Sequence, residues 1–176
     1  LWITFAKLWI TFLDFFLLLM YNEYRKLKKG SLKMKVIKLK PIKRQYKNNG
    51  QHAEQLADYA LTGQIRKADH VAFDKGSDIP ELEASVKSAR FTLASTLQGE
   101  TFKEQLEDYF TRTASKLAVY VSLELEAAFL MNMEEFRTFI ETFCKLQRSS
   151  SKSGGKPVIR MGTETKKVKE WLLERA

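Results

Sequence analysis

Acidic and basic side chains lie close together between Gly76 and Ala94, a stretch whose residue types suit metal and phosphate chemistry. Asp78 precedes a turn signal at Ile79-Pro80, and Lys87 lies in the strand-like run that follows. A carboxylate can hold a divalent metal ion, and a lysine ammonium can hold a phosphate or polarise a water. The stretch therefore predicts a metal site that acts on phosphate esters.

The strand-like part of this stretch predicts which side chains share a face. Side chains alternate along an extended strand, so Glu83, Ser85 and Lys87 would lie on one face. The residues between them would point into a core: Leu82, Ala84 and Val86. Alternatively, Lys87 is a partly buried lysine paired with Glu83, without a catalytic role.

A helix is predicted before this stretch, over residues 52–62. Its apolar residues recur at helical spacing, Asn48-Asn49-Gly50 supplies capping chemistry, and Gly63 is a strong stop signal. Glu54 lies in the first turn, beside the apolar stripe. The helix therefore carries a further carboxylate close to its beginning.

The remaining patterns predict an α/β domain with a central mixed sheet flanked by helices. Strands are expected over residues 82–93, 117–121, 127–131 and 158–161, and a last helix over residues 166–175. Two more helices would begin at capping boxes, Thr101 with Glu104 and Asn132 with Glu135. The single cysteine, Cys144, continues a helical apolar pattern as a small core residue and excludes a disulfide framework. Residues 148–157 are expected to form a loop.

The pattern of Asp78 and Lys87 resembles the PD-(D/E)XK nuclease superfamily, whose fold is restriction-endonuclease-like. In that family a helix carrying a Glu precedes a hairpin; its first strand presents an Asp, and its second ends in an acid, any residue, then Lys. Glu54, Asp78 and Lys87 match these positions, and the resemblance covers about residues 51–121. The rest of the chain looks like small proteins of this type encoded by phages or mobile elements.

One position departs from the family's pattern. Ser85 stands where the family has an acid two residues before the lysine, and a hydroxyl is a poorer ligand for magnesium than a carboxylate. Glu83 or Glu54 would supply the missing charge, with Glu81 as a further candidate. The backbone carbonyl of Val86 would complete the metal site.

The resemblance implies an endonuclease that hydrolyses phosphodiester bonds in DNA with Mg²⁺ or Mn²⁺. Asp78 and a Glu would bind the metal ion, which lowers the pKa of a water and offsets charge on the phosphate. Lys87 would orient that water or help to deprotonate it, and Ser88 and Arg90 would flank the phosphate. If Ser85 has removed the metal site, the same fold would bind nucleic acid without cleaving it.

The net charge of +9 is concentrated in the N-terminal part of the chain, because residues 51–176 carry 18 basic and 19 acidic side chains. Six basic residues without an acid lie between positions 35 and 47: Lys35, Lys38, Lys40, Lys43, Arg44 and Lys47. Residues 34–50 would therefore be a basic arm that binds DNA phosphates, ahead of a nuclease-like domain over residues 51–176. The alternative is a solvated arm that aids solubility.

Residues 1–33 form an apolar and then basic leader. LWITF occurs at residues 1–5 and again at 8–12, and Lys7 and Asp14, both costly inside a membrane, interrupt the apolar run. We expect that the leader is not part of the native protein, which would begin at Met34 and act in the cytoplasm, with a homodimer as its candidate assembly. The rival is a genuine membrane anchor with residues 25–33 on the cytoplasmic side.

Overall fold

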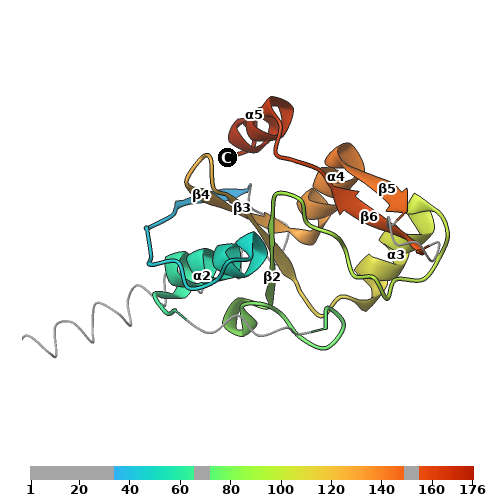
Figure 1. The fold of residues 1–176 in the computed structure, drawn as a ribbon, viewed down its shortest axis with the longest axis horizontal. Coiled ribbons are helices and arrows are strands. Elements are labelled where there is room, and N and C mark those ends of the chain that lie inside the picture. Colours follow the sequence, from blue (N-terminus) through green and yellow to red (C-terminus); the bar gives the residue numbers. More distant parts are fainter. Residues whose placement is uncertain (1–33, 66–71, 149–154) are drawn as a thin grey trace, which may run out of the picture. The chain divides into compact units, whose positions relative to one another are not determined.

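The computed structural model describes residues 34–65, 72–148 and 155–176, which form a mixed four-stranded sheet, a two-stranded ribbon and four α-helices (Figure 1). In sheet order the strands are β1 (Lys35–Lys38), β4 (Ala127–Asn132), β3 (Leu117–Ser122) and β2 (Ala84–Ser88). β3 and β4 form an antiparallel hairpin, β1 is antiparallel to β4, and β2 is parallel to β3. The predicted α/β class with a central mixed sheet is confirmed.

The helices begin and end where local signals predict. α2 (Asn49–Thr62) starts after Asn48, whose side chain accepts the Gly50 N–H, and ends at Gly63 in the left-handed conformation (φ 74°). α3 (Phe102–Arg112) and α4 (Met133–Phe143) each begin with the predicted capping box, and α5 (Lys166–Glu174) closes the chain. The predicted helices are therefore confirmed, with α2 starting three residues earlier than expected.

The sheet has apolar side chains on both faces. One face joins α3, α4 and α5 in a cluster that includes Tyr120, Phe129, Phe136 and Phe139, all fully buried. The alternate residues of β3, such as Val119, point to the other face, and α2 packs against β1, β2 and β3. The sheet is thus covered on both sides, and its β2 edge is left to form part of a cleft.

The predicted strand over residues 82–93 is wrong at both ends. A 3₁₀ turn, η1 (Pro80–Leu82), precedes Glu83, which has a left-handed backbone (φ 48°), so β2 begins only at Ala84. After Ser88 the chain leaves the sheet through Arg90, also left-handed (φ 65°). It then pairs with β6 (Pro157–Met161): the Leu93 N–H donates to the Ile159 carbonyl at 2.9 Å.

The helical assignment of Cys144 is also wrong, although its burial is as expected. α4 ends at Phe143, and Cys144 opens the strand β5 (Cys144–Arg148), which pairs antiparallel with β6. Cys144 is 6% exposed because its side chain faces the core. The two strands take only the first and last residues of the segment that was expected to be a loop, Arg148 and Pro157.

Several predictions lie outside the described residues. These include the leader over residues 1–33 and most of the expected loop, residues 149–154. Within the described part of the chain, no helix is both long enough and apolar enough to cross a membrane.

Candidate active site

Asp78 and Lys87 meet around the peptide group of Val86, at the outer edge of the sheet. An Asp78 Oδ2 atom accepts the Val86 N–H at 2.6 Å, and the Lys87 ammonium donates to the Val86 carbonyl at 2.9 Å. The Lys87 Nζ atom lies 3.8 Å from the same Asp78 oxygen. Both side chains keep about a fifth of their surface exposed (20% and 18%), so the pair is reachable by a ligand.

A tight turn brings Asp78 to this edge. Ile79 and Ala84 form a two-bond antiparallel bridge: each N–H donates to the other residue's carbonyl, at 3.0 and 3.2 Å. Pro80 begins the 3₁₀ turn between them, and Ile79 is fully buried and anchors the turn in the core. The chain folds back on itself in these few residues, so the Asp78 carboxylate reaches the Val86 N–H.

Glu54 on α2 brings a second carboxyl to the same cleft. Burial raises its pKa to about 7 from the usual 4.5; the negative charge of Asp78 adds to this effect, and the positive charge of Lys87 opposes it. Glu54, Asp78 and Lys87 all line the same cleft. A carboxyl with a pKa near 7 exchanges its proton at neutral pH, which is typical of functional sites.

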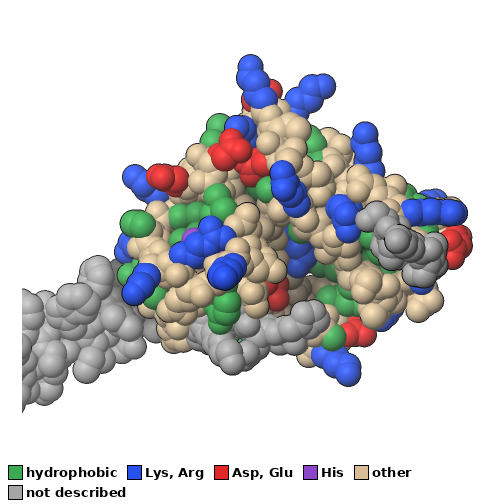
Figure 2. Space-filling model, in the orientation of Figure 1, with side chains coloured by type: hydrophobic (Ala, Val, Ile, Leu, Met, Phe, Trp, Pro, Cys, Tyr) green, Lys and Arg blue, Asp and Glu red, His purple; other side chains and the backbone are tan. Residues whose placement is uncertain are grey.

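The cleft around these groups has a volume of about 810 Å³. One wall is formed by Lys47 to Gln51, where the chain enters α2, and the floor is the end of β2 with the residues after it. The opposite wall contains Phe73, Tyr109 and residues 94–96. On the face drawn in Figure 2 the surface is hollowed near its centre, with basic and acidic side chains both at the hollow.

Among the residues predicted to hold phosphate, three line this cleft: Lys47, Ser88 and Arg90. Arg90 is exposed and has a left-handed backbone, which a residue other than glycine adopts at a cost. Such strain persists where surrounding contacts enforce it, here through the Arg90 N–H, which donates to the Gly162 carbonyl at 2.9 Å. The structure thus fixes the direction of the chain at the mouth of the cleft.

The other members of the basic arm lie away from the cleft lining. β1 contains Lys35 and Lys38, while Lys40 and Lys43 are exposed in the segment between β1 and α2. Arg44 donates to the carbonyls of Tyr46 and Lys47, both at 2.8 Å, so its guanidinium braces the loop that leads into α2. The segment is therefore partly built into the sheet.

The structure does not bring Glu83 or Ser85 into the cleft lining. Glu83 precedes β2, and its carbonyl accepts the N–H groups of Lys116 and Leu117, so the expected strand alternation does not apply to it. Ser85 is in β2 on the Lys87 face of the pleat, but it is only 6% exposed. Its hydroxyl has no hydrogen-bond partner among the described residues. Glu81, in η1, is exposed and does not line the cleft either.

Without Glu81, Glu83 and Ser85, the carboxylates that line the cleft could hold a magnesium ion that has few protein ligands. Glu54 and Asp78 offer two carboxylates, and Mg²⁺ is commonly bound by one or two carboxylates together with waters and phosphate oxygens. The Val86 carbonyl, the third expected ligand, accepts the Lys87 ammonium instead. Within residues 34–65, 72–148 and 155–176, no group of three or more His, Cys, Asp or Glu side chains is arranged to hold a metal ion.

The aromatic wall opposite α2 was not predicted as part of a site. Phe73 stacks on Tyr109 with ring centroids 5.4 Å apart, and both line the cleft. Tyr109 has the helical spacing of a core residue, and its sequence position gives no signal of a second role. The wall arises from contacts between segments far apart in the chain, which periodicity cannot predict.

No protein-family model, curated protein or solved structure matches the chain.

Proposed function

We propose that this protein is a metal-dependent nuclease that hydrolyses phosphodiester bonds in DNA in the cytoplasm, on a restriction-endonuclease-like fold. The observation that carries the proposal is the meeting of Asp78 and Lys87 around the Val86 peptide, with Glu54 facing the same cleft. Two carboxyls and one ammonium beside a cleft that also exposes basic side chains are suited to a phosphate ester and a divalent cation.

Asp78 and Glu54 would hold the metal ion. When bound, Mg²⁺ lowers the pKa of a coordinated water and offsets charge on the phosphate. The Val86 N–H holds the Asp78 carboxylate in place, and an oxygen fixed by a backbone donor loses little freedom when it binds a cation. Ser85 would contribute no charge to this site.

Lys87 and the basic residues of the cleft would act on the phosphate. The Lys87 ammonium can shift from the Val86 carbonyl to a phosphate oxygen and stabilise the negative charge that grows during hydrolysis. Lys47 and Arg90 would hold the flanking phosphates by charge.

A second candidate is a DNA-binding protein of the same fold that does not cleave. Ser85 in place of an acid favours it, as does the limit of two carboxylates at the cleft. Such a protein would keep the basic residues near the cleft, and its affinity for DNA would not depend on a divalent ion.

Cleavage of plasmid DNA in Mg²⁺ or Mn²⁺ distinguishes the two functions. Wild-type protein is expected to cut, and Asp78→Asn and Lys87→Met are each expected to lower the rate at least roughly 100-fold, since each removes a charge used at the reacting phosphate. The matched controls are Glu100→Gln and Lys103→Met, which replace exposed residues outside the cleft lining and should cut like wild type. Equal DNA binding in EDTA and Mg²⁺ without cutting would support the second function instead.

A further inference from the structure

The segment that contains the β5–β6 ribbon is strongly basic, although the domain around it is balanced in charge. Residues 51–176 carry 18 basic and 19 acidic side chains, but none of the acidic ones falls within residues 144–161. The basic side chains of this segment are Lys145, Arg148, Lys152, Lys156 and Arg160. Positive charges concentrated in one segment attract an anionic partner.

Two of these basic residues oppose each other directly across the ribbon. Lys145 in β5 is the antiparallel partner of Arg160 in β6, and both side chains are exposed. Like charges at opposed positions of two strands lower stability. Within the described parts of the chain, neither side chain forms an ion pair with an acidic residue. The pair therefore does not stabilise the fold, and its charge is available to a ligand.

This basic pair is connected to the lining of the cleft. On its other side β6 pairs with residues 91–93, where Thr92 is the partner of Arg160. The Arg160 Nε atom donates to the Thr92 hydroxyl at 3.1 Å, and Thr92 lines the cleft. Lys145, Arg160 and Thr92 thus form a row across three adjacent segments, and the row ends at the cleft.

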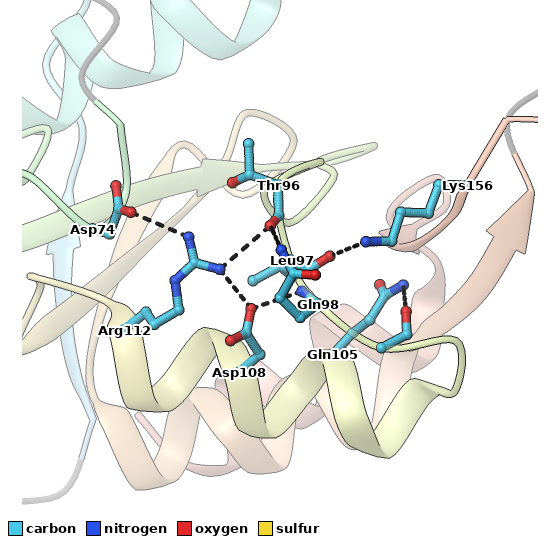
Figure 3. A network of polar contacts seen from close by, with 9 residues as sticks. Asp74, Thr96, Leu97, Gln98, Gln105, Asp108, Arg112 and Lys156 are labelled. Carbon is cyan, nitrogen blue, oxygen red and sulfur yellow. Dashed lines mark hydrogen bonds and ion pairs between the residues drawn. The ribbon is translucent and has the colours of Figure 1, made fainter.

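Side-chain contacts fix the beginning of β6 to α3 and to the wall of the cleft (Figure 3). The buried Gln105 amide of α3 donates to the Pro157 carbonyl at 2.7 Å. The Lys156 ammonium donates to the Leu97 carbonyl at 2.6 Å, just after the cleft-lining residues 94–96. The ribbon is thus held in place before any ligand binds, which lowers the entropic cost of binding.

The row is long enough to contact a nucleic-acid backbone outside the cleft. Neighbouring strands lie about 4.8 Å apart, so Lys145 is two such spacings, about 10 Å, from the cleft-lining Thr92. Phosphates of one DNA strand recur about every 3.4 Å along the helix axis, so the row corresponds to about three base pairs. It can bind phosphates that flank the one beside Asp78.

We propose that the exposed face of the β5–β6 ribbon, with Lys145 and Arg160 at its centre, binds the DNA backbone next to the phosphate in the cleft. This inference rests on the proposed nuclease function for the identity of the polyanion. The ribbon supplies affinity and orientation without reading the base sequence, because phosphates are the same in every sequence.

The test measures binding to the full chain in EDTA, where cleavage does not interfere. Fluorescence anisotropy follows a labelled DNA duplex of about 20 base pairs over a series of salt concentrations. The double variant Lys145→Gln/Arg160→Gln should weaken binding about tenfold. The slope of log K against log salt concentration should become shallower by about 0.9 for each lost phosphate contact, about 2 in total. The matched control is Lys166→Gln/Lys167→Gln, which removes the same charge from exposed positions of α5 outside the ribbon and the cleft lining. It should change the affinity and the slope far less.

A charge reversal separates lost binding from lost folding. Lys145→Glu would place a carboxylate opposite Arg160, so the variant should resist urea at least as well as wild type while its affinity for DNA falls. The inference is overturned if the ribbon variants bind DNA as wild type does, if the α5 control weakens binding equally, or if wild type binds no DNA.

Plasmid cleavage in Mg²⁺, measured in parallel, separates the ribbon surface from the nuclease. Cutting by a wild type whose DNA binding is unaffected by the ribbon variants retains the nuclease and rejects the ribbon surface. Binding that depends on the ribbon, without cutting, retains the surface and rejects the nuclease.

Discussion

Replacing Glu54 with glutamine should stabilise the metal-free protein at alkaline pH while it impairs cleavage. The folded protein holds the Glu54 carboxyl in a partly buried position beside Asp78, which disfavours its ionised form. Glutamine keeps the shape of the side chain and removes the charge. A residue that lowers the stability of the protein and is needed for activity is expected at a functional site. If Glu54 were purely structural, replacing it would instead lower the stability of the protein.

The magnitude follows from the pKa of Glu54. A rise from the usual 4.5 to about 7 corresponds to at most about 3 kcal/mol, and solvent screening of this half-buried group reduces it to about 1–2 kcal/mol. Because the pKa in the folded state lies above that of the unfolded chain, the folded protein binds the proton more tightly. The free energy of unfolding therefore falls as pH rises from about 4.5 through about 7.

Urea unfolding of wild type and Glu54→Gln in EDTA, from pH 4 to pH 8, measures this difference. We expect equal stabilities near pH 4 and an advantage of about 1–2 kcal/mol for Glu54→Gln at pH 8. Taking the difference between the two proteins at each pH removes the contribution that the other carboxyls make to both. A Glu54→Gln protein less stable than wild type at pH 8 would refute the electrostatic reasoning.

Three further outcomes are expected. Mg²⁺ should raise the melting temperature of wild type at pH 8 but not that of Asp78→Asn, because only the folded wild type would bind the ion; equal shifts in differential scanning fluorimetry would contradict this. The Asn132 side chain caps α4 by accepting the Glu135 N–H at 2.8 Å. Asn132→Ala removes this cap and should lower the free energy of unfolding in urea by about 1–2 kcal/mol, whereas Asn132→Asp should lower it far less. Burial raises the pKa of the Cys144 thiol to about 12, so a thiol reagent at pH 8 should label it only after unfolding, and rapid labelling of native protein would count against the burial.

Helices were predictable because their signals are local. Asn48 and Gly63 mark the two ends of α2 within a single stretch, and the pairs Thr101–Glu104 and Asn132–Glu135 each span one turn. Hydrogen bonds between neighbours in sequence do not depend on the rest of the fold, so the pattern alone predicts them.

Strand limits were not predictable in the same way. Cys144 follows Ile140 at helical spacing, yet pairing with β6 makes it a strand residue. Glu83 and Arg90 adopt left-handed backbones that their residue types disfavour, so no local rule would place the ends of β2 there. In each case contacts with distant residues determined the conformation.

The same distinction applies to the candidate site. The approach of Asp78 to Lys87 depends on one short turn, which the Ile79-Pro80 signal indicates. The wall around Tyr109 depends on Arg112 joining Asp74 to Thr96, which are far apart in sequence and share no motif. Sequence patterns therefore led to the charged end of the cleft and missed its aromatic end.

The position of β2 at the edge of the sheet explains why the charged residues can meet there. In a central strand, the peptide N–H and C=O groups form hydrogen bonds with a neighbouring strand on each side. Among the described strands β2 pairs only with β3, so the peptide groups on its other side are available to side chains. Asp78 takes the Val86 N–H and Lys87 the Val86 carbonyl, so the two side chains also cover an edge that would otherwise pair with another chain. A ligand that draws Lys87 away would uncover that carbonyl within the cleft, where a cation held by Asp78 can reach it. The same two residues thus protect the edge in the free protein.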